Sequence, residues 1–164
     1  VEVRVRADGW PVGHGEAGWY WRSYTVRLFD ADGRALAKAE RGLDGAWFTN
    51  LRSFSSAPNG RCAFQTGDWE TARLVVLSAK AEPLGSFMLP EEPKVPQLAF
   101  DGQHVLVGGW GAPRLLNPAT GVWQPLDPLE GEGWWIFHDP ASGEWVLLDR
   151  NGKRMLRAVL TKRS

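Results

Sequence analysis

The sequence predicts an all-β, antiparallel domain, and three observations lead to that prediction. The chain of 164 residues contains 19 glycines and 11 prolines, which are among the residues that tight turns use most. Short segments rich in apolar and aromatic residues lie between these turn residues, as strands do. The same order of turn and strand then recurs about every 40 residues along the chain.

Four segments have the composition of hairpin turns. Residues 30–33 (Asp-Ala-Asp-Gly) and 149–152 (Asp-Arg-Asn-Gly) each follow an apolar segment and end in a pair of residues that tolerates a positive φ. Residues 117–121 and 139–143 are nearly the same pentapeptide, with proline second and glycine last. Each predicts a turn whose glycine takes the left-handed conformation that a bulged hairpin requires.

Three segments are compatible with helices as well as with strands. Residues 34–41 have good helix propensity and stop at a glycine, and residues 68–82 begin with a capping aspartate and stop before a proline. The apolar residues within 153–161 fit a helical stripe and a strand equally well. We favour strands in all three segments because the repeat described next places strands there.

A repeat decides the predicted architecture. Gly60, Gly102 and Gly143, which are 42 and 41 residues apart, are each followed by two variable residues and an apolar segment. Further apolar stretches open with an Arg-Leu pair, at 27–28, 73–74 and 114–115. A spacing of about 40–45 residues is typical of the four-stranded blade of a β-propeller.

The sequence therefore predicts a single domain over residues 1–164, folded as a small four-bladed β-propeller. Its blades are expected at about 10–42, 43–90, 91–128 and 129–164, and prolines cluster at the last two cuts.

The fourth of these blades has room for only three strands, and residues 1–6 alternate apolar and charged side chains as a strand does. We expect this N-terminal strand to pair with residues 153–161 and so to close the ring. The alternatives are half of a larger propeller, which would pair with a copy of itself or with a partner chain, and a β-sandwich.

Two motifs resemble those of known propeller families. Residues 56–64, Ser-Ala-Pro-Asn-Gly-Arg-Cys-Ala-Phe, resemble the SPDG-(K/R)-x-x-AF signature of TolB-type β-propeller repeats, with an inserted alanine and Asn in place of Asp. Residues 116–123 are similar to the D-x-x-T-G turn that joins the two outer strands of quinoprotein-type blades. Each motif covers less than a quarter of the chain. The resemblance implies the propeller fold and no particular substrate, because such blades serve scaffolds, enzymes and carbohydrate binders alike.

Charge and cysteine usage exclude several classes of protein. The 19 basic and 19 acidic residues cancel, which argues against nucleic acid as a partner because nucleic-acid binders need a positive surface. No uninterrupted run of apolar residues approaches the length of a membrane span, which is about 18 residues. Cys62 is the only cysteine, so an internal disulfide and a multi-cysteine metal site are excluded, and we expect a buried, reduced strand residue.

The sequence offers no catalytic constellation and no metal motif. His14, His104 and His138 are the only histidines, and no pair of them has the spacing of a metal site. Asp30 and Asp32 suggest calcium, but the residues that follow lack the further oxygen ligands of a calcium loop, so a hairpin turn fits better. We therefore expect no cofactor and do not favour an enzyme.

Tryptophan carries the strongest indication of binding. The chain has ten tryptophans, most of which we assign to packing between strands. Trp10, Trp69 and Trp110 lie in predicted loops beside glycines and are the predicted binding residues, because exposed tryptophan is enriched at interfaces. The predicted function is a non-catalytic protein-binding or scaffold module. A lectin-like propeller that binds carbohydrate or a small ligand, and an enzyme with its site at the propeller mouth, are the alternatives.

Charge is unevenly distributed at the C-terminal end. Residues 127–149 contain six acidic and no basic side chains, and residues 150–164 contain six basic and no acidic ones. We expect neighbouring strands whose charges neutralise each other. The alternative is a basic tail at 162–164 that contacts an acidic partner.

The sequence leaves localisation and oligomeric state open. The chain begins with Val1, so we expect a processed, trimmed or fragmentary chain. A cytoplasmic protein is slightly favoured, and a protein whose signal peptide has been removed is also compatible with this start.

Overall fold

The computed structural model describes residues 4–14, 20–30, 32–67, 72–89, 97–109, 112–126, 133–149 and 151–159, with the backbone alone for 4–14 and 20–22. These residues form fourteen strands and, within the described ranges, no helix. The strands make four antiparallel sheets in which neighbours in sequence are neighbours in space. The predicted all-β, antiparallel class is confirmed.

The four sheets are named here in chain order. The first sheet contains β1 (Arg4–His14), β2 (Tyr20–Phe29) and β3 (Ala35–Ala39). The second contains β4 (Arg52–Ser56), β5 (Cys62–Thr66), β6 (Arg73–Leu77) and β7 (Pro83–Met88). The third contains β8 (Gln97–Phe100), β9 (Val105–Gly108), β10 (Arg114–Asn117) and β11 (Val122–Pro125). The fourth contains β12 (Trp134–Asp139), β13 (Glu144–Asp149) and β14 (Met155–Ala158).

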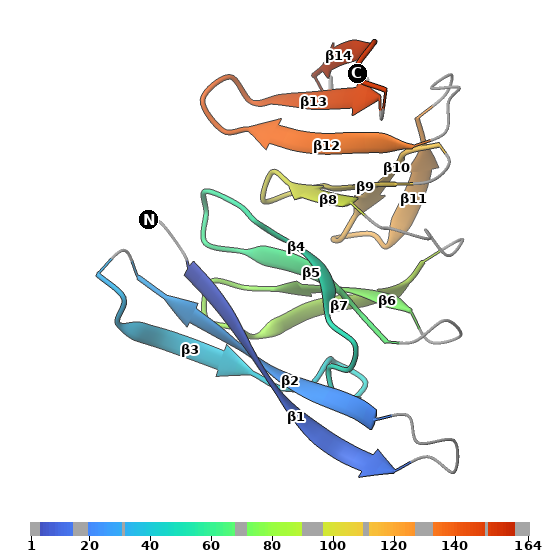
Figure 1. Ribbon diagram of the computed structural model, residues 1–164. Helices are drawn as coiled ribbons and strands as arrows, with labels where there is room; N and C mark the ends of the chain where they lie inside the picture. The colour runs from blue at the N-terminus through green and yellow to red at the C-terminus, as the bar shows by residue number, and fades with distance from the viewer. Residues whose placement is uncertain are drawn as a thin grey trace.

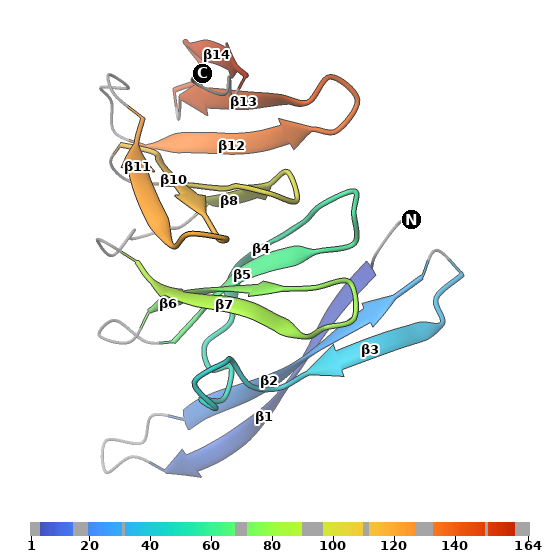
Figure 2. The same ribbon diagram turned by 180° about the vertical axis from the view of Figure 1, so that it is seen from behind.

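The sheets are stacked one after another, and Figures 1 and 2 show the first and the fourth sheet at opposite ends of the stack. The first strands of the last three sheets lie next to one another, β8 between β4 and β12. The predicted cuts between blades, at 42/43, 90/91 and 128/129, fall in the connections between these sheets. The number of blades and the single domain over 1–164 remain predictions.

The segments that were ambiguous between helix and strand each contain a strand, and their described residues contain no helix. β3 lies within 34–41, β6 within 68–82 and β14 within 153–161. Each pairs with the strand before it in the same sheet. Tertiary pairing therefore overrides the helix propensity of these segments, as it commonly does for short runs.

The predicted pairing of the N-terminal strand is wrong. Arg4 pairs with Phe29 and Arg6 with Arg27, so this segment belongs to the first sheet and not to the fourth; residues 1–3 lie outside the described residues. The reason is that β1 continues to His14 and forms a long hairpin with β2. A local hairpin closes a short loop, whereas pairing with residues 153–161 would close a loop of nearly the whole chain.

The predicted hairpin turns are present. Gly121 and Gly143 have φ values of 70° and 72°, and their N–H groups donate to the carbonyl oxygens of Asn117 and Asp139, each at 2.8 Å. In the second of these turns the Ser142 hydroxyl donates to Asp139 at 2.8 Å, and this bond is the main reason that the pKa of Asp139 is lowered. Gly33 and Gly152 also have positive φ values and close the other two turns.

The repeat glycines occupy equivalent places in the last three sheets. Gly60, Gly102 and Gly143 all have positive φ and lie in the turn between the first and second strand of their sheet. The Gly102 carbonyl accepts hydrogen bonds from Asn59 Nδ2 at 3.2 Å and from Arg61 Nη1 at 3.1 Å. A Cβ at Gly102 would collide with the Asn59 amide. These hydrogen bonds join the turns of the second and third sheets at Gly102, a position that only glycine can occupy.

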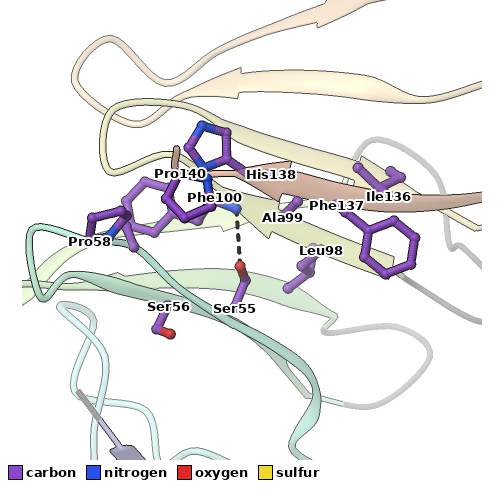
Figure 3. Close-up of a pocket in the computed structure, with 11 residues that line it drawn as sticks. Ser55, Ser56, Pro58, Leu98, Ala99, Phe100, Ile136, Phe137, His138 and Pro140 are labelled. Atoms are coloured by element: carbon purple, nitrogen blue, oxygen red, sulfur yellow. Dashed lines mark hydrogen bonds between the residues drawn. The ribbon is translucent and has the colours of Figure 1, made fainter. Parts of the chain in front are cut away.

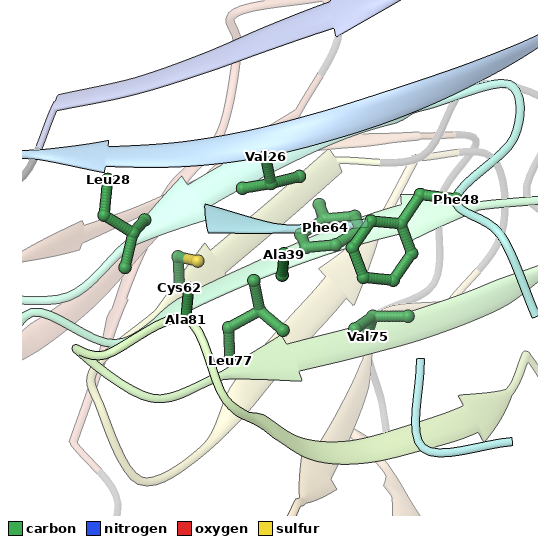
Figure 4. Packing of buried hydrophobic residues seen from close by; sticks show 9 residues of the cluster. All are labelled: Val26, Leu28, Ala39, Phe48, Cys62, Phe64, Val75, Leu77 and Ala81. Carbon is green, nitrogen blue, oxygen red and sulfur yellow. The ribbon is translucent and has the colours of Figure 1, made fainter. Parts of the chain in front are cut away.

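The core consists of three apolar layers, one between each pair of neighbouring sheets. Figure 4 shows the layer between the first and second sheets, where Phe64 has its ring centroid 4.9 Å from that of Phe48. Alternate residues of β5 face different layers, Cys62 and Phe64 toward the first sheet and Ala63 toward the third. A strand in the middle of this stack is consequently buried on both faces.

Two ion pairs join the acidic and the basic stretch, as we expect of neighbouring strands. Arg157 Nη1 of β14 lies 2.8 Å from Glu144 Oε2 of β13, and Arg154 Nε lies 3.3 Å from Asp149 Oδ2. The alternative, a basic tail at 162–164, lies outside the described residues.

Replacing Gln65 with leucine should stabilise the protein. Gln65 is 1% exposed, and neither its amide nitrogen nor its amide oxygen has a hydrogen-bond partner among the described residues. A buried polar group without a partner costs about 1–3 kcal/mol. Urea unfolding should therefore give Gln65→Leu a free energy of unfolding about 1 kcal/mol or more above that of the native protein. The exposed Gln103→Leu serves as control and should change it by less than about 0.5 kcal/mol. A loss of stability in Gln65→Leu would contradict this account.

The Cys62 thiol should be unreactive while the protein is folded. Burial raises the pKa of the Cys62 thiol to about 12, although a backbone hydrogen bond at Leu77 acts in the opposite direction. Only the thiolate reacts, so at pH 8 the folded protein should contain about a thousandfold less reactive species than the unfolded chain. Labelling with a maleimide should be slow in buffer, accelerate as the pH is raised, and be complete within minutes in denaturant. Rapid labelling at pH 8 without denaturant would show that Cys62 is exposed.

Candidate functional site

A groove runs along the free edges of the first strands. β4, β8 and β12 are each the terminal strand of their sheet, and they lie side by side. The groove has a volume of about 540 Å³. Figure 3 shows its lining, which comes from the three strands and from the turns that follow β4 and β12. The lining residues include Ser55, Ser56, Pro58, Leu98, Phe100, Phe137, His138 and Pro140.

A side-chain hydrogen bond holds two walls of the groove together. The Phe100 backbone N–H of β8 donates to Ser55 Oγ of β4 at 3.0 Å, as the dashed line in Figure 3 marks. This bond satisfies an N–H on the free edge of β8, which the sheet itself leaves without a partner. Ser55 therefore positions β4 relative to β8.

His138 brings an imidazole to the groove. Its ring centroid lies 5.0 Å from that of Trp145, at an interplanar angle of 56°. None of the described residues that line the groove is acidic, so they provide no carboxylate to orient this imidazole. The groove can accept hydrogen bonds from a ligand and pack against its apolar parts.

A second cavity, of about 460 Å³, lies between the second and third sheets. Arg61, Gln103, His104 and Asn117 are its polar lining residues. Arg61 already donates to the Gly102 carbonyl, and His104 Nδ1 lies 3.5 Å from Asp101 Oδ2. These polar side chains stabilise the turns between strands, so we assign this cavity a structural role.

Within the described ranges, no three His, Cys, Asp or Glu side chains lie close enough together to hold a metal ion. The same ranges contain no helix that is long and apolar enough to cross a membrane.

The fourth sheet exposes an apolar face at the end of the stack. Trp134, Ile136, Trp145 and Leu147 pack against the third sheet. The residues between them point the opposite way, because side chains alternate along a strand. We call this surface the outer face of the fourth sheet; its apolar residues are Trp135, Phe137, Val146, Leu148 and Met155.

Strand pairing arranges these residues in rows across the outer face. The first row is Trp135, Leu148 and Met155, and the second is Phe137, Val146 and Arg157. Trp135, Phe137 and Met155 are 42%, 54% and 60% exposed, respectively. The next row pairs Asp139 with Glu144, whose carboxylate binds Arg157. The face is thus apolar over its main part and charged along one end.

The predicted binding tryptophans are only partly placed by the structure. Trp10 lies in β1 opposite Ser23, so its prediction as a loop residue is wrong: the strand extends through the glycines around it. The Trp10 side chain, Trp69 and Trp110 lie outside the described residues.

Trp135 is an exposed tryptophan, although it belongs to the strand tryptophans that were expected to pack between strands. Trp134 and Trp135 are adjacent in a strand, so only one of them can face the third sheet, and Trp134 is the one that does, at 1% exposure. The signal that could have identified Trp135 is this adjacency, combined with the place of its strand in the last unit of the repeat.

Comparisons with known proteins bear on the fold alone. No protein-family model matches the chain, and no curated protein matches it. The crystal structure of TolB from Acinetobacter baumannii is similar to 86% of the chain, with a TM-score of 0.52 and 14% sequence identity. A Bacteroides caccae protein of unknown function is similar over 93%, with a TM-score of 0.45 and 18% identity. The chain covers 36% of the TolB structure and 61% of the second one.

The four stacked antiparallel sheets and the likeness to TolB define the class of this protein: it has a β-propeller-like fold. The predicted resemblance to β-propeller proteins is confirmed at this level.

Removing the Ser55 hydroxyl should loosen the groove. In Ser55→Ala the Phe100 N–H loses its acceptor, which should lower the free energy of unfolding by about 1 kcal/mol. Ser56→Ala is the matched control, because Ser56 is the exposed neighbour on the same strand, and it should change stability by less than about 0.5 kcal/mol. Amide hydrogen exchange at Phe100 should accelerate in the first variant only. Equal effects of the two substitutions would contradict the assigned role of Ser55.

Proposed function

We propose that this chain is a non-catalytic protein-binding module that uses the outer face of the fourth sheet as its contact surface. The observation that carries this proposal is the apolar composition of that face, with Trp135 and Phe137 exposed beside Leu148 and Val146. Contiguous exposed apolar surface with a polar rim marks protein interaction sites. Tryptophan is among the residues that contribute most binding energy at such sites.

We propose that the four sheets are blades of a TolB-type propeller. The segment that resembles the TolB-type signature, 56–64, lies at the end of β4, in the following turn and at the start of β5. The equivalent turns of the third and fourth sheets contain the other repeat glycines. Because the first and fourth sheets lie at opposite ends of the stack, we propose that this chain alone does not close the ring.

The exposed apolar side chains of the outer face would contribute binding energy to a contact. Completing the burial of a large apolar side chain that is about half exposed contributes on the order of 1 kcal/mol, and the face offers several such side chains. The charged end, where Arg157 meets Glu144, adds orientation more than affinity. The predicted contact through Trp10, Trp69 and Trp110 remains a second route for the same function.

A second candidate function is the binding of a carbohydrate or another small ligand in the groove. The observation in its favour is the combination of the Ser56 hydroxyl and the His138 imidazole with the apolar wall formed by Leu98 and Phe100. Polar groups that orient a ligand against an aromatic wall are typical of such sites. We rank this function second because the lining contributes few polar side chains.

The binding function can be tested by affinity capture with matched surface variants. The native chain, the double variant Trp135→Glu/Phe137→Glu and the control Leu43→Glu should be immobilised and exposed to extract from the source cells. Leu43 is 63% exposed and lies between β3 and β4, away from the outer face. A protein retained by the native chain and by the control, but lost from the double variant, is the expected result. Identical capture by all three would show that the outer face is not the contact surface.

A further inference from the structure

We propose that a second copy of this chain covers the outer face of the fourth sheet, an inference that rests on the binding function proposed above and names its partner. The two copies would meet sheet against sheet, as neighbouring sheets do within one chain. Three features of the described residues lead to this occupant: the register of the exposed residues, the shape of the face and the charge of the chain.

The register of the exposed residues is that of a second apolar face. The second and third sheets each bury apolar residues on both faces: Cys62 and Ala63 of β5 lie in different layers, and so do Val105 and Leu106 of β9. In β13, Trp145 packs against the third sheet, and Val146, the next residue, lies on the outer face. The outer face therefore has the apolar character of the faces that a neighbouring sheet covers elsewhere in the molecule.

The shape of the face selects another sheet as its partner. Its apolar side chains come from three strands and form rows across them, so they make up a broad surface and not a narrow cleft. Two sheets pack about 10 Å apart by interdigitating such rows, whereas a small ligand binds in a concave site. The chain itself builds three interfaces of this kind. In the one between the third and fourth sheets, the bulky Trp134 and Trp145 pack beside the small Ala99.

The charge of the chain favours a second copy over a charged partner. With 19 basic and 19 acidic residues the net charge is zero, so two copies approach without net repulsion. At the charged end of the face, Arg157 and the carboxylates of Asp139 and Glu144 provide both signs within one patch. A patch that contains both signs is complementary to itself when a copy is turned to face it.

The chain's own first sheet is not the occupant, because it lies at the opposite end of the stack. β1, the segment that was expected to reach the fourth sheet, is paired with β2. The described residues of this chain therefore leave the outer face without a cover.

Oligomeric state measured by light scattering and by sedimentation tests this proposal. The native chain should approach twice its mass of 18.2 kDa as its concentration is raised from about 1 to about 100 µM. Trp135→Glu/Phe137→Glu should weaken the association at least tenfold, because a charge would have to be buried in the interface. Leu43→Glu should associate as the native chain does. Circular dichroism and thermal unfolding of dilute samples establish that each variant is folded, and Met155→Lys is a milder second variant on the same face.

The outcomes separate this proposal from the one on which it rests. Association that is lost in the double variant and in Met155→Lys, and kept in the control, supports a second copy on the outer face. A native chain that stays at 18.2 kDa throughout overturns it, and so does association that survives both outer-face variants. If the native chain is a monomer that still captures a different protein through Trp135 and Phe137, the second copy is excluded while the binding function stands.

Discussion

The alternation of side chains along buried strands is the constraint on which this structure depends. β5 shows it most directly: Cys62 and Phe64 pack toward the first sheet while Ala63 packs toward the third. A sheet with two apolar faces cannot be stable alone, so each sheet needs a neighbour on either side. Stacking satisfies that need everywhere except at the ends, and the outer face of the fourth sheet exposes large apolar side chains at one of them. The candidate contact surface is thus a direct result of how the core is built.

Stacking alone does not fix how one sheet sits on the next, and polar contacts between repeats supply that information. Asn59 and Arg61 of the second sheet's turn bind the Gly102 carbonyl of the third, and Ser55 binds the Phe100 N–H a short distance away. Both contacts join residues about one repeat apart. They hold the first strands in line, and the groove is the space that this alignment leaves between three strand edges.

The fold could be predicted from local chemistry repeated at a fixed spacing. Turns such as 117–121 and 139–143 can be recognised because proline and glycine restrict the backbone whatever surrounds them. The partner of the N-terminal strand could not be predicted, because residues 1–6 show only that a strand exists and not which edge it joins. For the site, composition located tryptophan as the relevant residue type. It could not separate Trp134 from Trp135, because which face of a strand is covered depends on the number of sheets in the stack.

β14 has a consequence for how this protein avoids misassembly. It is the last strand of its sheet, and its four residues are all exposed, so its outer backbone groups could template a strand from any passing chain. Lys153, Arg154 and Arg157 lie in or beside it, and long basic side chains at such a position oppose the growth of ordered aggregates. The fourth sheet therefore combines an exposed apolar face with a basic edge strand, and the basic side chains oppose the addition of further strands at that edge.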